Sequence, residues 1–102
     1  MSLTGTWNGN DGSVTQIREL ETDTAKTIIW YSSNGGSSPF SNIFTGSYLP
    51  DGTGIILGQW DDVPPNTLSN SGTLRLSVNA AETQISQVSA SEGYGTTLWT
   101  KA

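Results

Sequence analysis

The feature that most constrains this fold is a regular alternation of short extended segments and turn sequences. The segments are six to ten residues long and rich in Thr, Val, Ile and aromatic residues, which favour strands. Gly, Asn, Asp and Pro gather between them, most clearly in Asn10–Gly12 and Pro50–Gly52, where they favour tight reversals. The pattern predicts eight strands, at residues 3–8, 13–20, 25–32, 40–49, 54–60, 72–79, 83–89 and 94–101.

No stretch of the chain has a convincing helical pattern. The best window is 78–88, through Ala80 and Ala81, but Thr and Ser interrupt it. Eight strands joined by short reversals form an antiparallel meander, and a flat meander would expose two sheet edges. We therefore predict an all-β, up-and-down, eight-stranded barrel, which closure leaves without edges. The alternative that the same strand count allows is a two-sheet β-sandwich.

The two longest interruptions of the strand pattern are predicted loops. Residues 33–39 are rich in Gly and Ser, and residues 61–71 contain Pro64 and Pro65. Proline has no backbone N–H, so strand pairing is expected to stop at this pair. Neither loop is long enough to separate two domains, and no internal repeat is visible. Residues 1–102 are therefore expected to form one domain.

Charge and composition exclude several classes of function. The net charge is −5, and the four basic residues are isolated at Arg18, Lys26, Arg75 and Lys101. Nucleic acids and anionic membranes need clustered cations, so neither is an expected partner. The chain has no Cys and no His, which removes disulfides, thiol nucleophiles and the commonest general base. With no phosphate loop or nucleophile elbow either, we expect no enzyme, no catalytic residues, no cofactor and no metal.

The N-terminal residues bear on the compartment of the protein. Met1–Gly5 has neither a charged region nor an apolar core of the kind found in signal peptides. No apolar run approaches the ~20 residues of a membrane helix. The expectation is a cytoplasmic protein, with secretion still possible if a leader had been removed.

The opening sequence Leu3–Trp7, followed by Gly12-Ser13, resembles the start of avidin-type barrels, and its Gly-x-Trp occurs across the wider calycin group. The resemblance implies an eight-stranded barrel in which Trp7 closes the floor. It departs from avidin at Gly9, where avidins place the Asn that binds the ureido oxygen of biotin, and only Ser13 matches. Biotin is therefore not the expected ligand.

A second resemblance covers most of the chain. Its centre is Gly58-x-Trp60-x-Asp62-Val63-Pro64, and it extends from Ile17-Arg18 to Gly93-Tyr94-Gly95 and Trp99. This series is similar to a small bacterial β domain whose members have no assigned function. The likeness supports the strand layout and marks the segment after Trp60, but it implies no activity.

Candidate site residues follow from the position of Trp60 at a predicted strand end. An aromatic side chain at a barrel mouth can pack against the apolar face of a sugar, while neighbouring amides and carboxylates bind its hydroxyls. The alternatives are a buried core position for each Trp, and a turn in which an Asp caps the backbone. A calcium site is not expected, because it needs six to eight oxygens. The predicted ligand-binding residues are Trp30, Asn42, Trp60, Asp61, Asp62 and Tyr94.

These observations favour a non-catalytic binding protein, with carbohydrate as the leading ligand class. One alternative, implied by the calycin resemblance, is an apolar small molecule held inside the barrel. Another is a structural or inhibitory protein-interaction module, such as a homo-oligomer. Such an interface would use Ile55 and Leu57, or Ile29 and Tyr31, on whichever strand face points outward.

Overall fold

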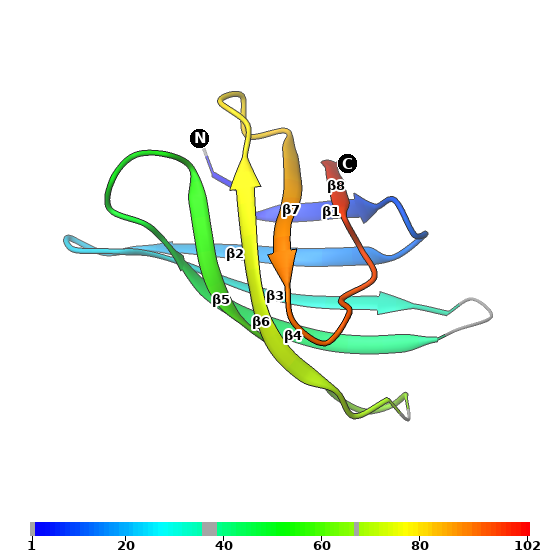
Figure 1. The fold of residues 1–102 in the computed structure, drawn as a ribbon. Coiled ribbons are helices and arrows are strands. Elements are labelled where there is room, and N and C mark those ends of the chain that lie inside the picture. Colours follow the sequence, from blue (N-terminus) through cyan, green and yellow to red (C-terminus); the bar gives the residue numbers. More distant parts are fainter. Residues whose placement is uncertain (1, 36–38, 67) are drawn as a thin grey trace.

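The computed structural model describes residues 2–35, 39–66 and 68–102, and these form an all-β fold. Eight antiparallel strands follow one another around a closed barrel (Figure 1). The prediction of an up-and-down barrel is therefore confirmed, and the sandwich alternative is not observed. The strands are β1 (Gly5–Gly9), β2 (Val14–Glu21), β3 (Lys26–Asn34), β4 (Phe40–Tyr48), β5 (Ile55–Asp62), β6 (Ser71–Val78), β7 (Gln84–Ala90) and β8 (Leu98–Lys101).

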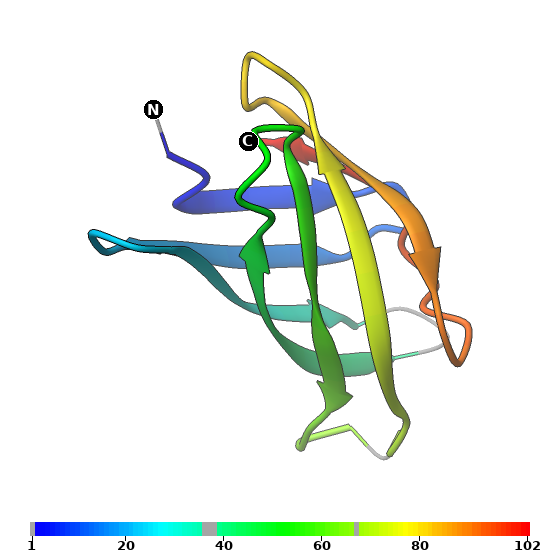
Figure 2. The same ribbon diagram turned by 60° about the vertical axis from the view of Figure 1, so that its left-hand side comes forward.

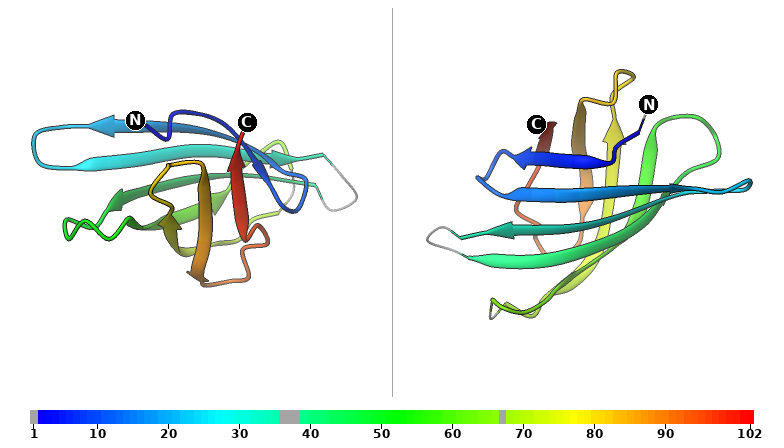
Figure 3. Two further views of the ribbon diagram at one scale, coloured as in Figure 1. Left: turned by 90° about the horizontal axis from the view of Figure 1, so that it is seen from above. Right: turned by 180° about the vertical axis from the view of Figure 1, so that it is seen from behind.

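Closure occurs where the first strand meets the last. β1 pairs with β8 through three residues, from Trp7 opposite Lys101 to Gly9 opposite Trp99. The Ala102 N–H then donates to the Thr6 carbonyl at 2.9 Å. Figure 3 shows β8 beside β1 both from above and from behind. The two strands that would be edges in an open sheet therefore form backbone hydrogen bonds with each other.

The barrel is strongly bent at the β4–β5 pair. β1 to β4 cross the view of Figure 1, whereas β6 and β7 are steeply inclined to them, and Figure 2 shows the same change of direction. Gly46 and Gly58 face each other across β4 and β5. The Phe44 ring packs over both glycines, so a Cβ at either position would overlap it. Glycine therefore allows β4 and β5 to approach and an aromatic ring to cover them.

Alternation along each strand builds the core. Trp7, Ile28, Phe44, Leu76 and Trp99 are fully buried, and neighbouring positions in their strands face outward. The predicted core positions of Trp7 and Trp99 are confirmed. Four aromatic residues are fully buried and contribute much of the core volume: Trp7, Trp30, Phe44 and Trp99.

Most strand boundaries differ from the sequence prediction by one or two residues. β3 continues to Asn34, and β5 continues through Asp61 and Asp62, which were assigned to a loop. The loop 63–70 then contains a cis peptide bond between Pro64 and Pro65. Of the two predicted loops, residues 36–38 and Thr67 lie outside the described residues.

The largest boundary error concerns the last predicted strand, because β8 begins at Leu98 instead of Tyr94. Residues 91–97 instead cross one end of the barrel. Asn10 holds the end of this segment, since its Oδ1 accepts the Thr97 N–H at 3.1 Å. Buried Tyr94 holds its middle.

The described residues contain no α-helix, and hence no helix that could cross a membrane.

Candidate functional site

The meander places alternate turns at opposite ends of the barrel. We call one end the Trp60 mouth, formed by the turn 10–13, the loop 63–70 and the segment 91–97. We call the other the Tyr48 mouth, formed by the turns 22–25, 49–54 and 79–83. Both ends are hollowed, and the interior between them is filled by the core side chains.

The Trp60 mouth contains a hollow of about 120 Å³. It brings together four of the six predicted site residues: Asn42 from β4, Trp60 and Asp62 from β5, and Tyr94 from the segment 91–97. Apolar, polar and acidic groups share the lining. The remaining lining residues are Phe40, Leu68, Asn70, Glu92, Gly93, Gly95 and Thr96.

The two remaining predicted residues lie elsewhere. Asp61 is exposed on the outer wall, opposite Ile43 and Ser71, and does not line the hollow. Trp30 is 1% exposed and lies deeper in the barrel, stacked on Phe44 with ring centroids 4.5 Å apart. The alternation of β5 separates the adjacent carboxylates, because neighbouring residues of a strand face opposite sides.

Asp62 links β5 to the end of the following loop. Its Oδ2 accepts the Asn70 N–H at 3.0 Å, and its own N–H donates to the Asn70 carbonyl at 2.8 Å. The alternative interpretation, in which an Asp side chain caps the backbone in a turn, is confirmed for the cap, because Asp62 accepts the Asn70 N–H, but wrong for the turn, because both carboxylates belong to β5. Asp62 still accepts a backbone N–H and remains partly exposed at the rim of the hollow.

Tyr94 forms the boundary between the hollow and the core. It is only 6% exposed, and its hydroxyl donates to Asn42 Oδ1 at 2.9 Å. Its ring meets Trp60 edge-on, with centroids 5.0 Å apart. Burial raises the pKa of the Tyr94 hydroxyl, while the polar side chains of Trp30, Ser32 and Asn42 beside it act in the opposite direction. Tyr94 therefore remains protonated at neutral pH.

Below Tyr94 the barrel wall carries buried hydroxyls. Thr15 of β2 and Ser32 of β3 share a hydrogen bond of 2.8 Å. Nearer the rim, the Asp11 carboxylate accepts the Ser13 hydroxyl at 2.6 Å and the Thr96 hydroxyl at 2.8 Å. These contacts tie the turn 10–13 to the segment 91–97. The Trp60 end of the interior is therefore polar, whereas the rest of the core is apolar.

The indole N–H groups of Trp30, Trp60 and Trp99 are buried at this end of the barrel without a hydrogen-bond partner in the described part of the chain. Trp30 lies beside the Tyr94 hydroxyl without forming an aligned hydrogen bond. Trp7, in contrast, donates its indole N–H to the Leu3 carbonyl at 2.8 Å. Buried donors are normally paired, and among the described residues these three groups are the exceptions.

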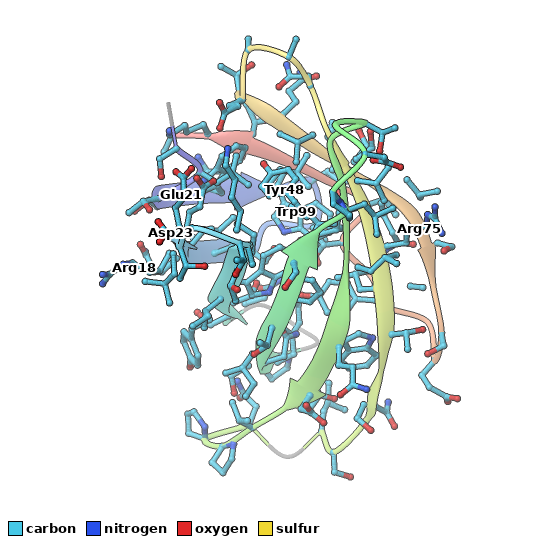
Figure 4. The ribbon with its side chains drawn as sticks, turned by 90° about the vertical axis from the view of Figure 1, so that its left-hand side faces the viewer. Arg18, Glu21, Asp23, Tyr48, Arg75 and Trp99 are labelled. Atoms are coloured by element: carbon cyan, nitrogen blue, oxygen red, sulfur yellow. The ribbon has the colours of Figure 1, made fainter. Side chains whose placement is uncertain are left out.

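The Tyr48 mouth is wider, with a hollow of about 730 Å³. Figure 4 looks into this end, where Tyr48 lies near the centre and Glu21 and Asp23 lie to one side. Half-burial, followed by the charges of Glu19 and Glu82, raises the pKa of Tyr48. Lys26 of the same chain already lies over the Tyr48 ring, with its Nζ 5.8 Å from the centroid. The single aromatic face at this mouth is therefore partly covered.

Metal ligands do not gather in the part of the chain that the structure describes: no group of three or more Asp and Glu side chains is close enough to hold an ion.

The sequence analysis missed several groups at the Trp60 mouth. Phe40, Leu68, Asn70, Glu92 and Thr96 complete its hollow. Its hydroxyl layer could have been found from strand parity. Thr15 shares the inward parity of Ile17, and Ser32 that of Trp30, so both hydroxyls point into the barrel at the same end. Strand parity could not have predicted the path of the segment 91–97, because this segment is not a strand.

Comparisons with known proteins add no assignment: no protein family, curated protein or solved structure matches this chain.

Proposed function

We propose that the protein is a non-catalytic carbohydrate-binding barrel that holds one sugar residue at the Trp60 mouth. The observation that carries this proposal is the lining of the 120 Å³ hollow, which combines apolar surface with amide and carboxylate groups. Phe40 and Leu68 offer partly exposed apolar contact. Asp62 and Asn70 offer groups that can bind sugar hydroxyls at its rim.

The size of the hollow limits the ligand. Drug-sized ligands occupy pockets of about 300–1,000 Å³, so this hollow has room for about one sugar ring. Trp60 and Tyr94 are nearly buried, at 4% and 6% exposure, and therefore form the floor of the site. The protein would bind a terminal monosaccharide unit, and the remainder of a glycan would extend into solvent.

The fully buried Trp7, Ile28, Phe44 and Leu76 fill the barrel interior. That packing offers no support for the alternative of an apolar ligand inside the barrel. Ile29, Tyr31 and Leu57 face outward and are each 40% exposed, so they could form the interface of a homo-oligomer, which stays a prediction. Light scattering at several protein concentrations would measure the molar mass and so the oligomeric state.

The adjacent carboxylates provide a matched test of the sugar site. A glycan array and ligand-observed NMR would first identify a bound sugar. Asp62→Asn should weaken its binding about tenfold, because hydrogen bonds to a charged group contribute about 1.5–3 kcal/mol. Asp61→Asn makes the same change on the outer wall and should leave the affinity unaltered. No binding to any glycan, or equal effects of the two variants, would contradict the proposal.

A further inference from the structure

Exposed apolar side chains gather on the outer wall that β2, β3, β4 and β5 form. Of the eight large apolar side chains that are most exposed, six belong to these four strands: Val14, Leu20, Ile29, Tyr31, Ile43 and Leu57. Tyr31 lies directly opposite Ile43, and Ile29 lies two positions from Tyr31 on the same face of β3. We call these three residues the wall patch. The view from behind in Figure 3 faces the strands that carry it. Such a contiguous apolar surface marks a candidate contact with another macromolecule.

Two charged residues of opposite sign lie at opposite edges of the wall patch. Arg18 of β2 pairs with Ile29 in the ladder, and Asp61 of β5 pairs with Ile43. Both charged side chains are exposed. β2 and β5 are three strand spacings apart, which separates the two residues by roughly 14 Å across the sheet. They are too far apart to form an ion pair within one copy, so each can pair with a partner that presents the opposite charge.

Negative charge is otherwise concentrated at the two mouths. Asp61 is one of nine acidic residues in the chain, and the other eight lie at or beside the mouths: Asp11, Glu19, Glu21, Asp23, Asp51, Asp62, Glu82 and Glu92. The net charge of the protein is −5, so two copies would repel each other most strongly end to end. A second copy can approach the wall patch with less repulsion, and the cores of protein interfaces are likewise depleted of acidic residues.

We propose that the wall patch is the interface of a symmetric dimer of this chain, in which the β2 edge of each patch lies over the β5 edge of the other. The second copy supplies what the patch lacks: apolar side chains to cover Tyr31 and Ile43, and charges opposite to those of Arg18 and Asp61. A two-fold axis makes this contact self-complementary, because each copy contributes the same surface.

The positions of Arg18 and Asp61 select the direction of the two-fold axis. An axis that lies in the interface and runs along the strands, between β3 and β4, exchanges the β2 and β5 edges. Each Arg18 then approaches the edge of the other copy that carries Gln59 and Asp61. An axis across the strands would instead place β2 over β2 and leave Arg18 without an acidic partner. Charge complementarity therefore favours the axis along the strands.

An axis along the strands places both Trp60 mouths at the same end of the dimer. β3 and β4 extend from one mouth of the barrel to the other, and rotation about an axis parallel to them does not exchange the ends. This consequence rests on the proposed function, because two sugar sites at one end would bind two glycans of one surface and gain avidity. The dimer itself does not depend on sugar binding.

The first experiment measures molar mass by analytical ultracentrifugation between about 10 μM and about 1 mM protein, the range that suits a reversible contact of small area. The mass should rise from that of the 10.8 kDa monomer towards that of a dimer. Arg18→Glu and Asp61→Arg should each raise the dimer Kd about tenfold, and the double variant should restore dimerisation. Arg75→Glu makes the same change of charge on β6, outside the patch, and should leave the Kd unchanged. A monomeric native protein, or a double variant that stays monomeric, would overturn the inference.

A second pair of variants tests the apolar part of the interface. Ile43→Thr keeps a β-branched side chain on β4 but places a hydroxyl opposite Tyr31, and it should weaken the dimer about fivefold. Val88→Thr is the matched control, because Val88 is exposed on β7, away from the wall patch. Equal effects of the two variants on the dimer Kd would place the contact on another surface and contradict the inference.

The direction of the axis can be measured with one spin label per copy, because the chain has no Cys. Gly35→Cys would carry the label, since Gly35 follows β3 at the end with the Trp60 mouth and a Cβ there meets nothing within 4 Å. An axis along the strands should bring the two labels within about 25 Å, whereas an axis across the strands would separate them by roughly 35 Å. Pulsed electron paramagnetic resonance measures this distance, and the longer value would overturn the proposed arrangement.

The outcomes also separate this inference from the proposed function. If the native protein dimerises through the patch but binds no glycan, the dimer stands and the proposed function fails. If a monomeric native protein binds a glycan through Asp62, the proposed function stands and the dimer fails. If both hold, the native protein should leave a densely glycosylated surface about fivefold more slowly than Arg18→Glu, although both bind the free sugar equally. Equal dissociation rates would reject binding through two mouths at one end.

Discussion

Tyr94 connects the chemistry of the Trp60 mouth to the stability of the barrel, because its hydroxyl is buried in the protonated form. Its pKa is raised by burial, and that of Tyr48 is raised by partial burial and by Glu19 and Glu82. A group whose folded-state pKa exceeds its unfolded value stabilises the protein fully below the unfolded pKa. That stabilisation is lost as the pH rises towards the folded value.

We therefore expect the free energy of unfolding to fall as the pH rises above about 10, the pKa of tyrosine in an unfolded chain. Tyr94 should contribute a slope of about 1.4 kcal/mol per pH unit, and half-exposed Tyr48 a smaller one. Urea unfolding at a series of alkaline pH values, with tyrosinate absorbance as a second probe, measures the slope. Tyr94→Phe should reduce it, and an unchanged slope would contradict the assignment.

For single residues, the sequence predicted the position of a side chain where strand alternation determines it. It did not predict the position where tertiary contacts determine it. Trp7 and Trp99 were correctly placed in the core. Tyr94 was placed at the start of a strand because Ser91–Gly93 before it has turn composition, but contacts with Asn42 and Gln87 place it across the mouth instead. Asn42 is 52 residues from Tyr94 in the sequence, and Gln87 contacts it from the neighbouring strand β7, so neither contact could be predicted from a local pattern.

The β4–β5 pair depends on two glycines facing each other, with the Phe44 ring over both. A Cβ at Gly58 would overlap the Thr45 carbonyl oxygen and lie 2.7 Å from the Phe44 ring. Gly58→Ala should therefore destabilise the protein by about 1–3 kcal/mol, as overpacked cores do. Gly35→Ala is the matched control, because a Cβ there meets nothing within 4 Å. Thermal unfolding of both variants tests the prediction, which a small loss in Gly58→Ala would contradict.

The turn between β6 and β7 contains a strained residue. Glu82 has φ 57°, and Asn79 closes the turn, since its Oδ1 accepts the Thr83 N–H at 2.8 Å and the Gln84 N–H at 3.0 Å. Left-handed backbone costs an ordinary residue about 1–2 kcal/mol, while glycine loses about 0.5–1 kcal/mol through chain entropy. Glu82→Gly should therefore raise stability by about 0.5 kcal/mol.

Glu82→Ala separates this backbone effect from charge. It removes the same carboxylate near Tyr48 but keeps a Cβ in the left-handed conformation. Only the glycine variant should gain stability in thermal or denaturant unfolding. An equal gain in both variants would assign the effect to charge.

Across the whole molecule, the number of strands and their order were predictable, but the closing contact was not. Turn signals and alternation identify eight strands, and exposed edges argue for closure. The register of β1 against β8 and the bend at β4–β5 depend on packing between distant residues. The candidate site was likewise predictable only in part. Strand alternation places Asn42 inward, but only the closed barrel brings Asn42 to Tyr94.

Closure through a short strand should make the barrel unevenly stable. β8 has four residues and forms three ladder pairs with β1 and three with β7. β3 and β4 instead share eight ladder pairs. Local opening is easiest where few contacts are lost, so we expect the β1–β8 amides to exchange hydrogen fastest among the strands and the β3–β4 amides slowest.

Amide hydrogen exchange followed by NMR at low denaturant concentration can test this order. Exchange at the β1–β8 seam should depend weakly on denaturant, because a local opening exposes little surface, whereas exchange at β3–β4 should follow global unfolding. Trp99 would reinforce the seam, since its fully buried side chain anchors β8 to the core. If all strands exchanged with one free energy and one denaturant dependence, β8 would be an integral part of a single cooperative unit. The barrel would then close in the same step in which the core forms.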